Sequence, residues 1–498
     1  MGVCPMFIHV GFPNKPVMFL LPLIEDEGAA KKRRHHNVPI ILCLSSFGCN
    51  NSLCLPINCG EEPKLAKQCN KDASPLFTVI IPNKNRAKYL HHTLRTCMMQ
   101  NYEPLEVLVS DDGSTDNARE VVEDASRRDS RIRLISPGAG GGMRDNFEYA
   151  LRQVKPGFVI ALGGDDGLLP DGIKGMRDVL HDTGMDLLAW PPPSYVYPNV
   201  YGSNGQLIIF HRRGSKIIDS HQFLCKQAKN LNYLNDIESP TFYVKGVAST
   251  KLIDRVRNRS VDGRFYSCST PDGYSGIVLA GEVSHYAFSG KPFSIGGASP
   301  DSQGLAYKLN DEKAKKASEL FFQNASLIPM HRELASQPYS PLLALMTVDY
   351  LLTARDLPGW PGSFPPIDFR RVLLKGLQAL AHGFYGEERI CRELKILNQI
   401  AEKHGLGEFF LEKTRRSRRY RRRDPFVGSG INASAFFLDG CQLGLHNIFD
   451  AAYAAKYLYQ VYSDIKLSSV VNVIARSLMY RLRSMAKGNP FPPESEWA

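Results

Sequence analysis

Strand and helix patterns alternate between Leu76 and Leu162, and this alternation constrains the fold more strongly than any other feature of the sequence. Short apolar or β-branched runs predict buried strands, and the segments between them place apolar residues at helical spacing. The predicted strands are Leu76–Ile81, Leu105–Ser110, Arg131–Ile135 and Phe158–Leu162, and the predicted helices are Ala87–Met99, Asp116–Arg127 and Met143–Arg152. We therefore expect βαβ units, and with them an α/β domain with a mostly parallel, twisted sheet flanked by helices.

Two residues refine these boundaries. Pro82 follows the first apolar run and is expected to end that strand, because proline cannot donate a ladder hydrogen bond. Thr115 precedes the second helical stretch and is expected to cap it. Both predictions place loop residues at the carboxyl ends of strands, which is where ligands collect in open parallel sheets.

The sequence pattern differs on either side of this region. Residues 1–73 show no sustained period and are rich in Cys, Pro, Asn and Lys, so we expect a poorly ordered N-terminal extension. Residues 305–498 contain long periodic stretches that predict a mainly α-helical C-terminal domain. The predicted helices there are Ala314–Phe322, Leu342–Leu352, Phe369–Leu380 and Glu388–His404. The α/β domain is thus expected to span residues 74–304 of the 498.

Charge and cysteine content limit the kinds of partner and the cellular compartment that we expect for the protein. The net charge of +11 indicates an anionic partner, which is nucleic acid, a membrane surface or a phosphorylated substrate. The 11 cysteines include no C-x-x-C pair that would indicate zinc, and their scattered placement favours reduced thiols. No segment approaches the ~20 apolar residues of a membrane span, and none has the order of a signal peptide. We therefore expect a cytoplasmic protein.

Three acidic positions follow predicted strands or open a predicted helix. Asp111 and Asp112 come directly after the second strand, and Asp165 and Asp166 lie between glycines directly after the fourth. Asp272 follows a proline at the expected start of a helix. Because the carboxyl ends of parallel strands meet at one edge of a sheet, the first two positions are expected to lie close together.

Each acidic position also has a purely structural interpretation. The segment Asp111–Asp116 is a good turn and helix cap in any protein, and Asp272 suits the first turn of a helix. The adjacent Asp165 and Asp166 are harder to explain in this way, because neighbouring carboxylates at the end of a buried strand repel each other. A divalent cation or a ribose hydroxyl would relieve that cost.

The glycine-rich segment Gly138–Gly142 follows a strand and precedes a helix, as a dinucleotide-binding loop does. The third glycine of G-x-G-x-x-G would fall at Met143, and the chain has no G-K-[ST] motif. We therefore expect a flexible loop near the ligand edge of the sheet.

Five motifs, taken in order, carry a resemblance to a known family. They are Val79–Arg86, Leu90 with Gln100–Tyr102, Asp111–Asp116, Arg144–Phe147, and Gly164–Gly167 with Leu169-Pro170. In this order and spacing they resemble the family 2 glycosyltransferases of GT-A fold, over residues 74–304. Within the C-terminal region, Gly430–Ala433 and Phe449–Ala452 resemble a bacterial type of these enzymes.

The resemblance implies a role for each position. The nucleotide base would lie against Pro82, Asn85, Arg86 and Asp111, with Asp112 and Arg144 also in the nucleotide-sugar site. Asp165 would contact the ribose, and Asp166 would ligate Mg²⁺ or Mn²⁺ on the two phosphates. Asp272 would be the general base that removes the proton of the acceptor hydroxyl. The implied reaction displaces a nucleoside diphosphate and inverts the anomeric carbon.

The sequence departs from the family at Gly164, where relatives usually carry a further aspartate. The loss of this carboxylate would weaken metal binding, or it would remove only a residue that supports the metal ligands. Two other functions therefore stay open, a catalytically silent nucleotide-binding relative and a nucleic-acid-binding protein. The presence of both Asp166 and Asp272 argues against the silent relative.

The C-terminal region carries two basic features. Lys413–Arg423 is nearly all Lys and Arg, which fits a solvated linker, an anionic membrane surface or, least well, nucleic acid. Ile465–Lys487 has an apolar stripe opposite three basic residues, which fits packing on the domain or a lipid interface. Contact with the cytoplasmic face of a membrane would suit an enzyme whose acceptor is a glycan or a lipid-linked glycan.

Overall fold

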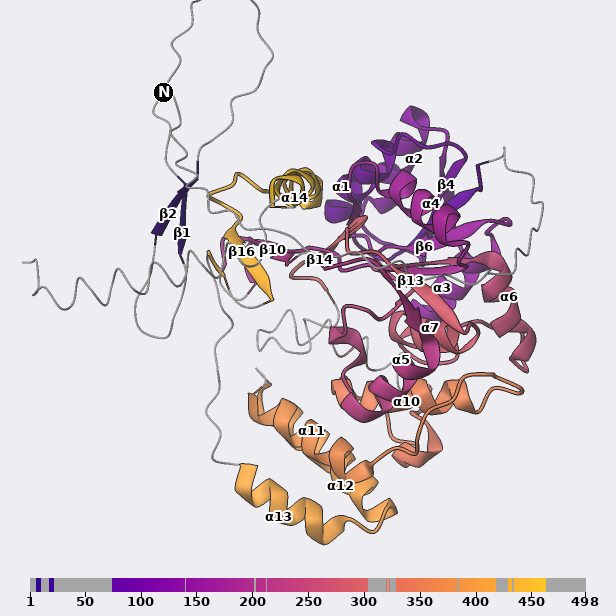
Figure 1. The fold of residues 1–498 in the computed structure, drawn as a ribbon, viewed down its shortest axis with the longest axis vertical. Helices are drawn as coiled ribbons and strands as arrows, with labels where there is room; N and C mark the ends of the chain where they lie inside the picture. The colour runs from indigo at the N-terminus through magenta and orange to yellow at the C-terminus, as the bar shows by residue number, and fades with distance from the viewer. Residues whose placement is uncertain are drawn as a thin grey trace, which may run out of the picture. The chain divides into compact units, whose positions relative to one another are not determined.

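The computed structural model describes residues 6–9, 18–21, 74–138, 140–200, 203–211, 213–302, 319, 322, 328–382, 385–417, 429–431 and 434–462. The chain forms two compact units, Met1–Phe7 with Phe19–Ser74 and Ile8–Met18 with Pro75–Ala498. Of residues 1–73 the structure describes two short strands, β1 (Met6–His9) and β2 (Met18–Leu21). The predicted helix at Ile465–Lys487 lies outside the described residues. All other elements belong to the second unit (Figure 1).

The main sheet has eight strands in the order β11-β13-β8-β12-β6-β3-β4-β5. Their bounds are Lys216–Asp219, His285–Phe288, Leu187–Ala189, Gly246–Ser249, Phe158–Ala161, Phe77–Asn83, Leu105–Asp111 and Ile132–Ile135. The four strands β6, β3, β4 and β5 are parallel, as the alternation predicts. Beyond β6 the sheet is mixed, because β12 runs antiparallel to both β6 and β8, and β11 runs antiparallel to β13.

Helices cover both faces of this sheet. They are α1 (Ala87–Met98), α2 (Ala118–Arg128), α3 (Gly142–Arg152), α4 (Gly172–Thr183), α5 (Ser220–Asn230), α6 (Thr250–Arg259) and α7 (Pro271–Gly281). Successive strand residues point to opposite faces, so Val79 and Ile81 pack in a core with α1, α2 and α4, whereas Ile80 packs with α3, α5, α6 and α7. Apolar residues on both faces explain the continuous apolar runs of these strands.

Two predicted boundaries are wrong for physical reasons. Pro82 does not end β3, because the pairing with β6 already stops at Ile80, and the ring nitrogen of Pro82 faces that unpaired side. Thr115 does not cap α2, because its backbone N–H and its hydroxyl both donate to Asn85 Oδ1. The helix instead begins at Ala118, whose N–H donates to Asp116 Oδ1 at 3.1 Å.

A second sheet joins distant parts of the chain. Its order is β15-β16-β10-β9-β14-β7, with bounds Gly430–Ile431, Ala435–Asp439, Gln206–Phe210, Ser194–Val196, Ser294–Ala298 and Gly167–Leu168. Strand β16 pairs antiparallel with β10, so the C-terminal region completes a sheet of the α/β part. Helix α14 (Ile448–Tyr462) follows, and its Phe449 ring lies 3.8 Å from the Arg95 guanidinium on α1.

The rest of the described C-terminal region is mainly helical, as predicted. Its helices are α10 (Leu343–Arg355), α11 (Phe369–His382), α12 (Glu387–Lys403) and α13 (Gly407–Ser417). They share a core that includes Leu345, Leu373 and Ile400. Most of the predicted helix Ala314–Phe322 and the expected domain boundary near residue 304 lie outside the described residues. Over the described ranges, no helix has the length and apolar character needed to cross a bilayer.

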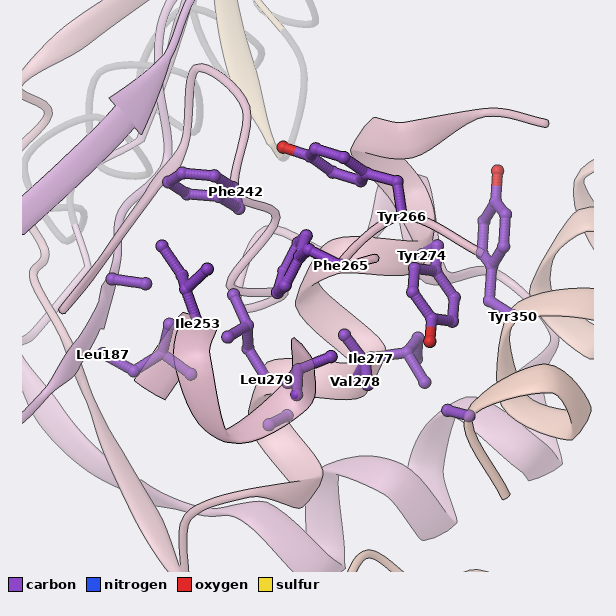
Figure 2. Close-up of a cluster of buried hydrophobic side chains, with 14 of the residues drawn as sticks. Leu187, Phe242, Ile253, Phe265, Tyr266, Tyr274, Ile277, Val278, Leu279 and Tyr350 are labelled. Carbon is purple, nitrogen blue, oxygen red and sulfur yellow. The ribbon is translucent and has the colours of Figure 1, made fainter. Parts of the chain in front are cut away.

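Helix α10 packs directly against α7, the helix that carries Asp272. A Cβ atom at Gly273 would lie 2.3 Å from the Tyr350 ring, so only glycine allows this approach. Figure 2 shows the shared core, with Tyr350 of α10 beside Tyr274 of α7 and with Phe242 and Phe265 nearby. The start of α7 is therefore fixed by the C-terminal region as well as by the sheet.

Asp349 on α10 is buried beside Cys268, which precedes α7. Its carboxylate accepts hydrogen bonds from the His331 backbone N–H, at 2.7 Å, and from the Cys268 thiol. Burial raises the pKa of Asp349 from 3.8 to about 6. The folded state therefore keeps a proton that the unfolded chain loses in this range of pH.

We expect the free energy of unfolding to fall as pH rises from about 4 to about 6, because the folded state binds more protons than the unfolded state there. Asp349→Asn is neutral at every pH and should remove this contribution. At pH 7 the variant should be more stable than the wild type by up to about 3 kcal/mol. Urea denaturation of both proteins at several pH values measures the difference, and a difference that does not change with pH would contradict the assignment.

Candidate active site

The ends of β3 and β4 are tied together by polar side chains. Asp111 Oδ1 accepts hydrogen bonds from Asn83 Nδ2, at 2.9 Å, and from the Ser114 hydroxyl, and its Oδ2 accepts the Ser114 N–H at 2.9 Å. Buried Asn146 of α3 accepts from the Ser110 hydroxyl at 2.6 Å and donates to the Ser110 carbonyl. A carboxylate has about four acceptor positions, so Asp111 keeps one for a ligand.

Asp112 is used differently, although it is adjacent in sequence. It is buried, and Lys84 Nζ donates to its Oδ2 at 3.0 Å. The backbone N–H groups of Gly140 and Gly141 donate to Oδ1, and that of Gly142 donates to Oδ2. These four donors fill its acceptor capacity. Asp112 therefore holds the glycine segment and the start of α3, and offers no acceptor to a nucleotide in this arrangement.

Pro82 and Asn85 lie at the same edge of the sheet. Pro82 is the penultimate residue of β3, and the exposed Asn85 has a positive φ of 53°. The Asn85 N–H donates to Ser114 Oγ at 2.8 Å, and its Oδ1 accepts the Thr115 N–H at 2.7 Å. Asn85 thereby joins the loop after β3 to the loop after β4, both of which the sequence assigns to the base site.

Arg86 and Asp165 meet at the turn that follows β14. Asp165 Oδ2 accepts hydrogen bonds from the hydroxyls of Ser299, at 2.6 Å, and Ser302, at 2.7 Å. Arg86 donates to Ser299 Oγ and to the Asp301 carbonyl, and it lies 3.9 Å from Asp165 Oδ2. All described partners of the Asp165 carboxylate thus bind Oδ2, which leaves Oδ1 for a ligand hydroxyl.

Asp166 is buried and points into the protein through several hydrogen bonds. Its Oδ2 accepts the Gly163 N–H and its Oδ1 accepts the Gly297 N–H, both at 2.7 Å. The Tyr243 hydroxyl also forms a hydrogen bond with this carboxylate. Burial, followed by the charge of Asp165, raises the pKa of Asp166 to about 7. The predicted repulsion between the two carboxylates is therefore present in the structure.

These residues fit a divalent cation that is held partly by substrate. The described part of the chain contains no cluster of three His, Cys, Asp or Glu side chains that could hold a metal alone. Magnesium, however, is commonly bound through one or two carboxylates together with substrate phosphates. The adjacent carboxylates of Asp165 and Asp166 provide such a pair. A Cβ atom at Gly164 would lie 3.0 Å from Arg86 Cβ and 3.2 Å from Asn83 Oδ1, so the local packing is fitted to glycine.

Asp272 lies in the first turn of α7, as predicted, directly after Pro271. Its side chain is partly exposed, and burial raises its pKa above 3.8, whereas the nearby Lys245 ammonium lowers it. Burial raises the pKa of the Tyr243 hydroxyl well above its ordinary value, and the charges of Asp166, Asp165 and Asp272 raise it further. The three carboxylates are therefore close enough to act on one hydroxyl, which places them in one region of the molecule.

Arg144 lies in α3, beside this region. Its guanidinium pairs with Asp145 Oδ1 at 3.0 Å, and Arg264 donates to the same oxygen at 2.6 Å. Burial raises the pKa of the Cys268 thiol, which lies just before α7, and the charge of Arg144 acts in the opposite direction.

Sequence reasoning missed the residues that hold the carboxylates. Ser299 and Ser302 bind Asp165, the Gly297 backbone binds Asp166, and Tyr243 lies between the acidic positions. None belongs to a motif, and each lies far along the chain from the carboxylate it contacts. Asn83, Lys84 and Ser114, which hold Asp111 and Asp112, do lie inside the Val79–Arg86 and Asp111–Asp116 motifs.

Part of the chain matches a known protein family. Residues 78–238 match the family described as glycosyl transferase family 2. This segment contains Asp111, Asp165 and Asp166 and ends before Asp272. Residues 78–238 therefore form a glycosyl transferase family 2 domain, and the α/β part of the chain has the GT-A fold.

Curated relatives match over about a fifth of the chain. Glycosyltransferase GlyG of Streptococcus pneumoniae is 25% identical over 115 residues, which are 23% of this chain and 38% of that protein. A Campylobacter jejuni protein named GalNAc(5)-diNAcBac-PP-undecaprenol beta-1,3-glucosyltransferase is 33% identical over 101 residues, 20% of this chain and 33% of that one. The chain thus spans about two fifths or less of the length of these relatives.

Solved structures are similar at lower identity. S. aureus TarS 1-349 in complex with UDP-GlcNAc is 14% identical, with coverage of 72% of this chain and 98% of that chain and a TM-score of 0.37. The mannosyltransferase PcManGT from Pyrobaculum calidifontis, in complex with GDP-Man and Mn²⁺, is 15% identical, with coverage of 68% and 88% and a TM-score of 0.32. The family assignment rests on the sequence match.

Proposed function

We propose that this chain is an inverting glycosyltransferase that moves a sugar from a nucleotide-sugar to an acceptor hydroxyl. The observation that carries the proposal is the pair of adjacent carboxylates, Asp165 and Asp166, after β6 of a glycosyl transferase family 2 domain, with Asp272 close enough that all three charges act on the Tyr243 hydroxyl. Such a transfer needs charge stabilisation on the leaving diphosphate and a base at the acceptor oxygen. The region supplies carboxylates for both tasks.

The donor side of the site is assigned to the ends of β3, β4 and β6. Asp111 retains one acceptor position that would take a base N–H, and Asp165 Oδ1 would accept from a ribose hydroxyl. Arg86 is already held against the Asp165 side of this pocket, where its charge would favour a diphosphate. Pro82 and Asn85 would form the wall that the base lies against.

The diphosphate is assigned to Asp166. A Mg²⁺ or Mn²⁺ ion held by Asp166 and, through solvent or directly, by Asp165 would neutralise the charge that develops on the leaving diphosphate. The chain's own residues orient this carboxylate through the Gly163 and Gly297 backbone N–H groups. The diphosphate is therefore expected to approach from the side that these two bonds leave open.

Asp272 is assigned as the general base. Its carboxylate would take the proton from the acceptor hydroxyl while that oxygen attacks the anomeric carbon opposite the leaving group, which inverts the carbon. The raised pKa of Asp272 suits this role, because a carboxylate with a higher pKa accepts a proton more readily. Its partly exposed side chain in the first turn of α7 would allow an acceptor to reach it.

The acceptor is proposed to be a hydroxyl of a glycan or a lipid-linked glycan. The Campylobacter relative carries an undecaprenol-linked acceptor in its name. On α13, Leu411 is half exposed and lies just before the basic run Lys413–Arg423, of which residues 418–423 lie outside the described part of the chain. We therefore place the enzyme in the cytoplasm, with contact to the anionic cytoplasmic face of a membrane.

We expect the arginines within residues 415–423 to be required for binding to anionic vesicles. Their replacement by Gln should reduce sedimentation with phosphatidylserine-containing liposomes at low salt, because each basic residue near the surface contributes about 1 kcal/mol. A control replaces Arg119, Arg127 and Arg128, which are exposed on α2. Equal sedimentation of both variants, or no sedimentation of the wild type, would contradict the membrane assignment.

The rival functions are separated by one screen. Thermal stability is measured with UDP-, GDP-, dTDP- and CMP-sugars, each with and without Mn²⁺. A glycosyltransferase should be stabilised by one nucleotide class more strongly with Mn²⁺. A silent relative would bind nucleotide without turnover, and a nucleic-acid-binding protein would bind duplex or single strands in a salt-sensitive way instead.

A further inference from the structure

The turn Thr241–Lys245 has an unusual backbone. The Tyr243 N–H donates to the Thr241 carbonyl at 2.7 Å, and the Lys245 N–H donates to the Tyr243 carbonyl at 2.6 Å, so two tight turns follow each other. Val244, a β-branched residue, has a positive φ of 59°. This conformation is strained for valine and persists only where the surroundings impose it. Strained turns of this kind concentrate at functional sites.

The surroundings of Val244 do impose this conformation. Its N–H donates to the Ala161 carbonyl of β6 at 2.9 Å, and its own carbonyl accepts from the buried Ser294 hydroxyl. Its side chain is buried in the core with Trp190 and Phe293. The turn is therefore anchored on the end of the strand that leads into Asp165 and Asp166.

The turn directs neighbouring side chains to two parts of the site. Tyr243 points to the Gly163–Asp166 loop, where a Cβ atom at Gly163 would lie 2.4 Å from the Tyr243 hydroxyl and 2.8 Å from Asp166 Oδ2. Lys245 donates to the carbonyls of Leu234 and Asp236, at 3.1 and 2.9 Å, and lies near Asp272. The Tyr243 hydroxyl therefore leaves no room for a side chain at position 163.

The donors around Asp166 limit how this carboxylate can bind a ligand. The N–H groups of Gly163 and Gly297 and the hydroxyl of Tyr243 occupy three of its roughly four acceptor positions. The two N–H donors are backbone groups and cannot be altered by substitution of their own side chains. Tyr243 is the described side-chain donor to Asp166, and it completes the set that fixes the rotation of the carboxylate.

We propose that Tyr243 is a positioning residue that fixes the one acceptor position of Asp166 left for a divalent cation. This inference rests on the proposed function, because it assigns Asp166 to the cation. Groups that orient a ligand by hydrogen bonding commonly contribute about 10- to 100-fold to metal affinity. The strained turn at Val244 holds the tyrosine in place before any ligand arrives.

The test compares Mn²⁺ affinity in Tyr243→Phe and wild type. Bound Mn²⁺ is measured by electron paramagnetic resonance in the presence of UDP, GDP, dTDP or CMP in turn. We expect Tyr243→Phe to lower the affinity about 10- to 100-fold without loss of secondary structure. The matched control is Tyr266→Phe, because the buried Tyr266 hydroxyl has no hydrogen-bond partner among the described residues. That control should bind Mn²⁺ as the wild type does.

A second variant separates positioning from a general loss of packing. Gly163→Ala adds a methyl group against the Tyr243 hydroxyl, so it should weaken Mn²⁺ binding strongly in the wild type and less in the Tyr243→Phe background. Additive losses, or equal affinities of wild type and Tyr243→Phe, would overturn the role of Tyr243. Failure of the wild type to bind Mn²⁺ with any of the nucleotides would instead overturn the proposed function.

Discussion

Replacement of Asp272 by Asn should lower turnover by on the order of a hundredfold or more while leaving donor affinity nearly unchanged. The substitution keeps the size of the side chain and removes its ability to take a proton. Because Asn is nearly as good as Asp at a helix start, the stability of α7 should change little. The measurement is steady-state transfer to the acceptor, together with nucleotide binding by calorimetry.

The pH dependence gives this prediction a second check. Because the pKa of Asp272 is raised above 3.8, the wild-type rate should fall as pH falls through that raised value, since the protonated acid cannot act as a base. Asp272→Asn should lack this acidic limb. Asp254→Asn, on the exposed face of α6, is the control and should turn over at the wild-type rate. Unchanged turnover in Asp272→Asn would contradict its role as the general base and leave it only a structural role at the start of α7.

Replacement of Asp166 by Asn should abolish Mn²⁺-dependent donor binding. The amide keeps an acceptor for one of the two glycine N–H groups but carries no charge for a cation. The fold should survive, because the substitution also removes the repulsion between Asp166 and Asp165. The measurement is calorimetric titration of nucleoside diphosphate with and without Mn²⁺.

The control for Asp166 is a carboxylate that is not in the site. Asp178→Asn, on α4, removes a charge that pairs with Arg177 at the surface and should bind donor and Mn²⁺ normally. Circular dichroism of both variants verifies that they are folded. Undiminished Mn²⁺-dependent binding in Asp166→Asn would remove this residue from the cation site.

The parallel half of the fold was predictable because its strands are buried on both faces. Runs such as Phe77–Ile81 read as strands in isolation, and the helices between them show a single apolar face. The antiparallel half was not predictable in this way. Its strands are short, as in β8 (Leu187–Ala189) and β12 (Gly246–Ser249), and they are defined by their partners more than by their own pattern.

The C-terminal strands show the same limit. Ala435–Asp439 pairs with Gln206–Phe210, more than 200 residues earlier by the numbering, and nothing local indicates that partner. The prediction of a mainly helical region was confirmed for α10 to α13, but it missed this contribution to the second sheet. Helices of about a dozen residues or more carry their own periodic signal, whereas a five-residue strand such as β16 does not.

The site divides along a similar line. The acidic positions could be found from sequence because glycines and strand ends surround them, and the structure brings Asp165, Asp166 and Asp272 close enough to act on the hydroxyl of Tyr243. The hydrogen-bond partners of each carboxylate could not be predicted from the sequence. Asp111 and Asp112 are adjacent, yet the first retains an acceptor position and the second is filled by Lys84 and three glycine N–H groups.

The most direct test of the account is a crystal structure of the protein with Mn²⁺ and the nucleoside diphosphate selected by the thermal screen. We predict the base between Pro82 and Asp111, the ribose at Asp165 Oδ1, and Mn²⁺ bound to Asp166 and to phosphate oxygens. The Asp272 carboxylate should face the space beyond the β-phosphate, where the sugar and the acceptor meet. A nucleotide bound elsewhere, or an Asp272 carboxylate that faces no such space, would contradict the assignment of this site.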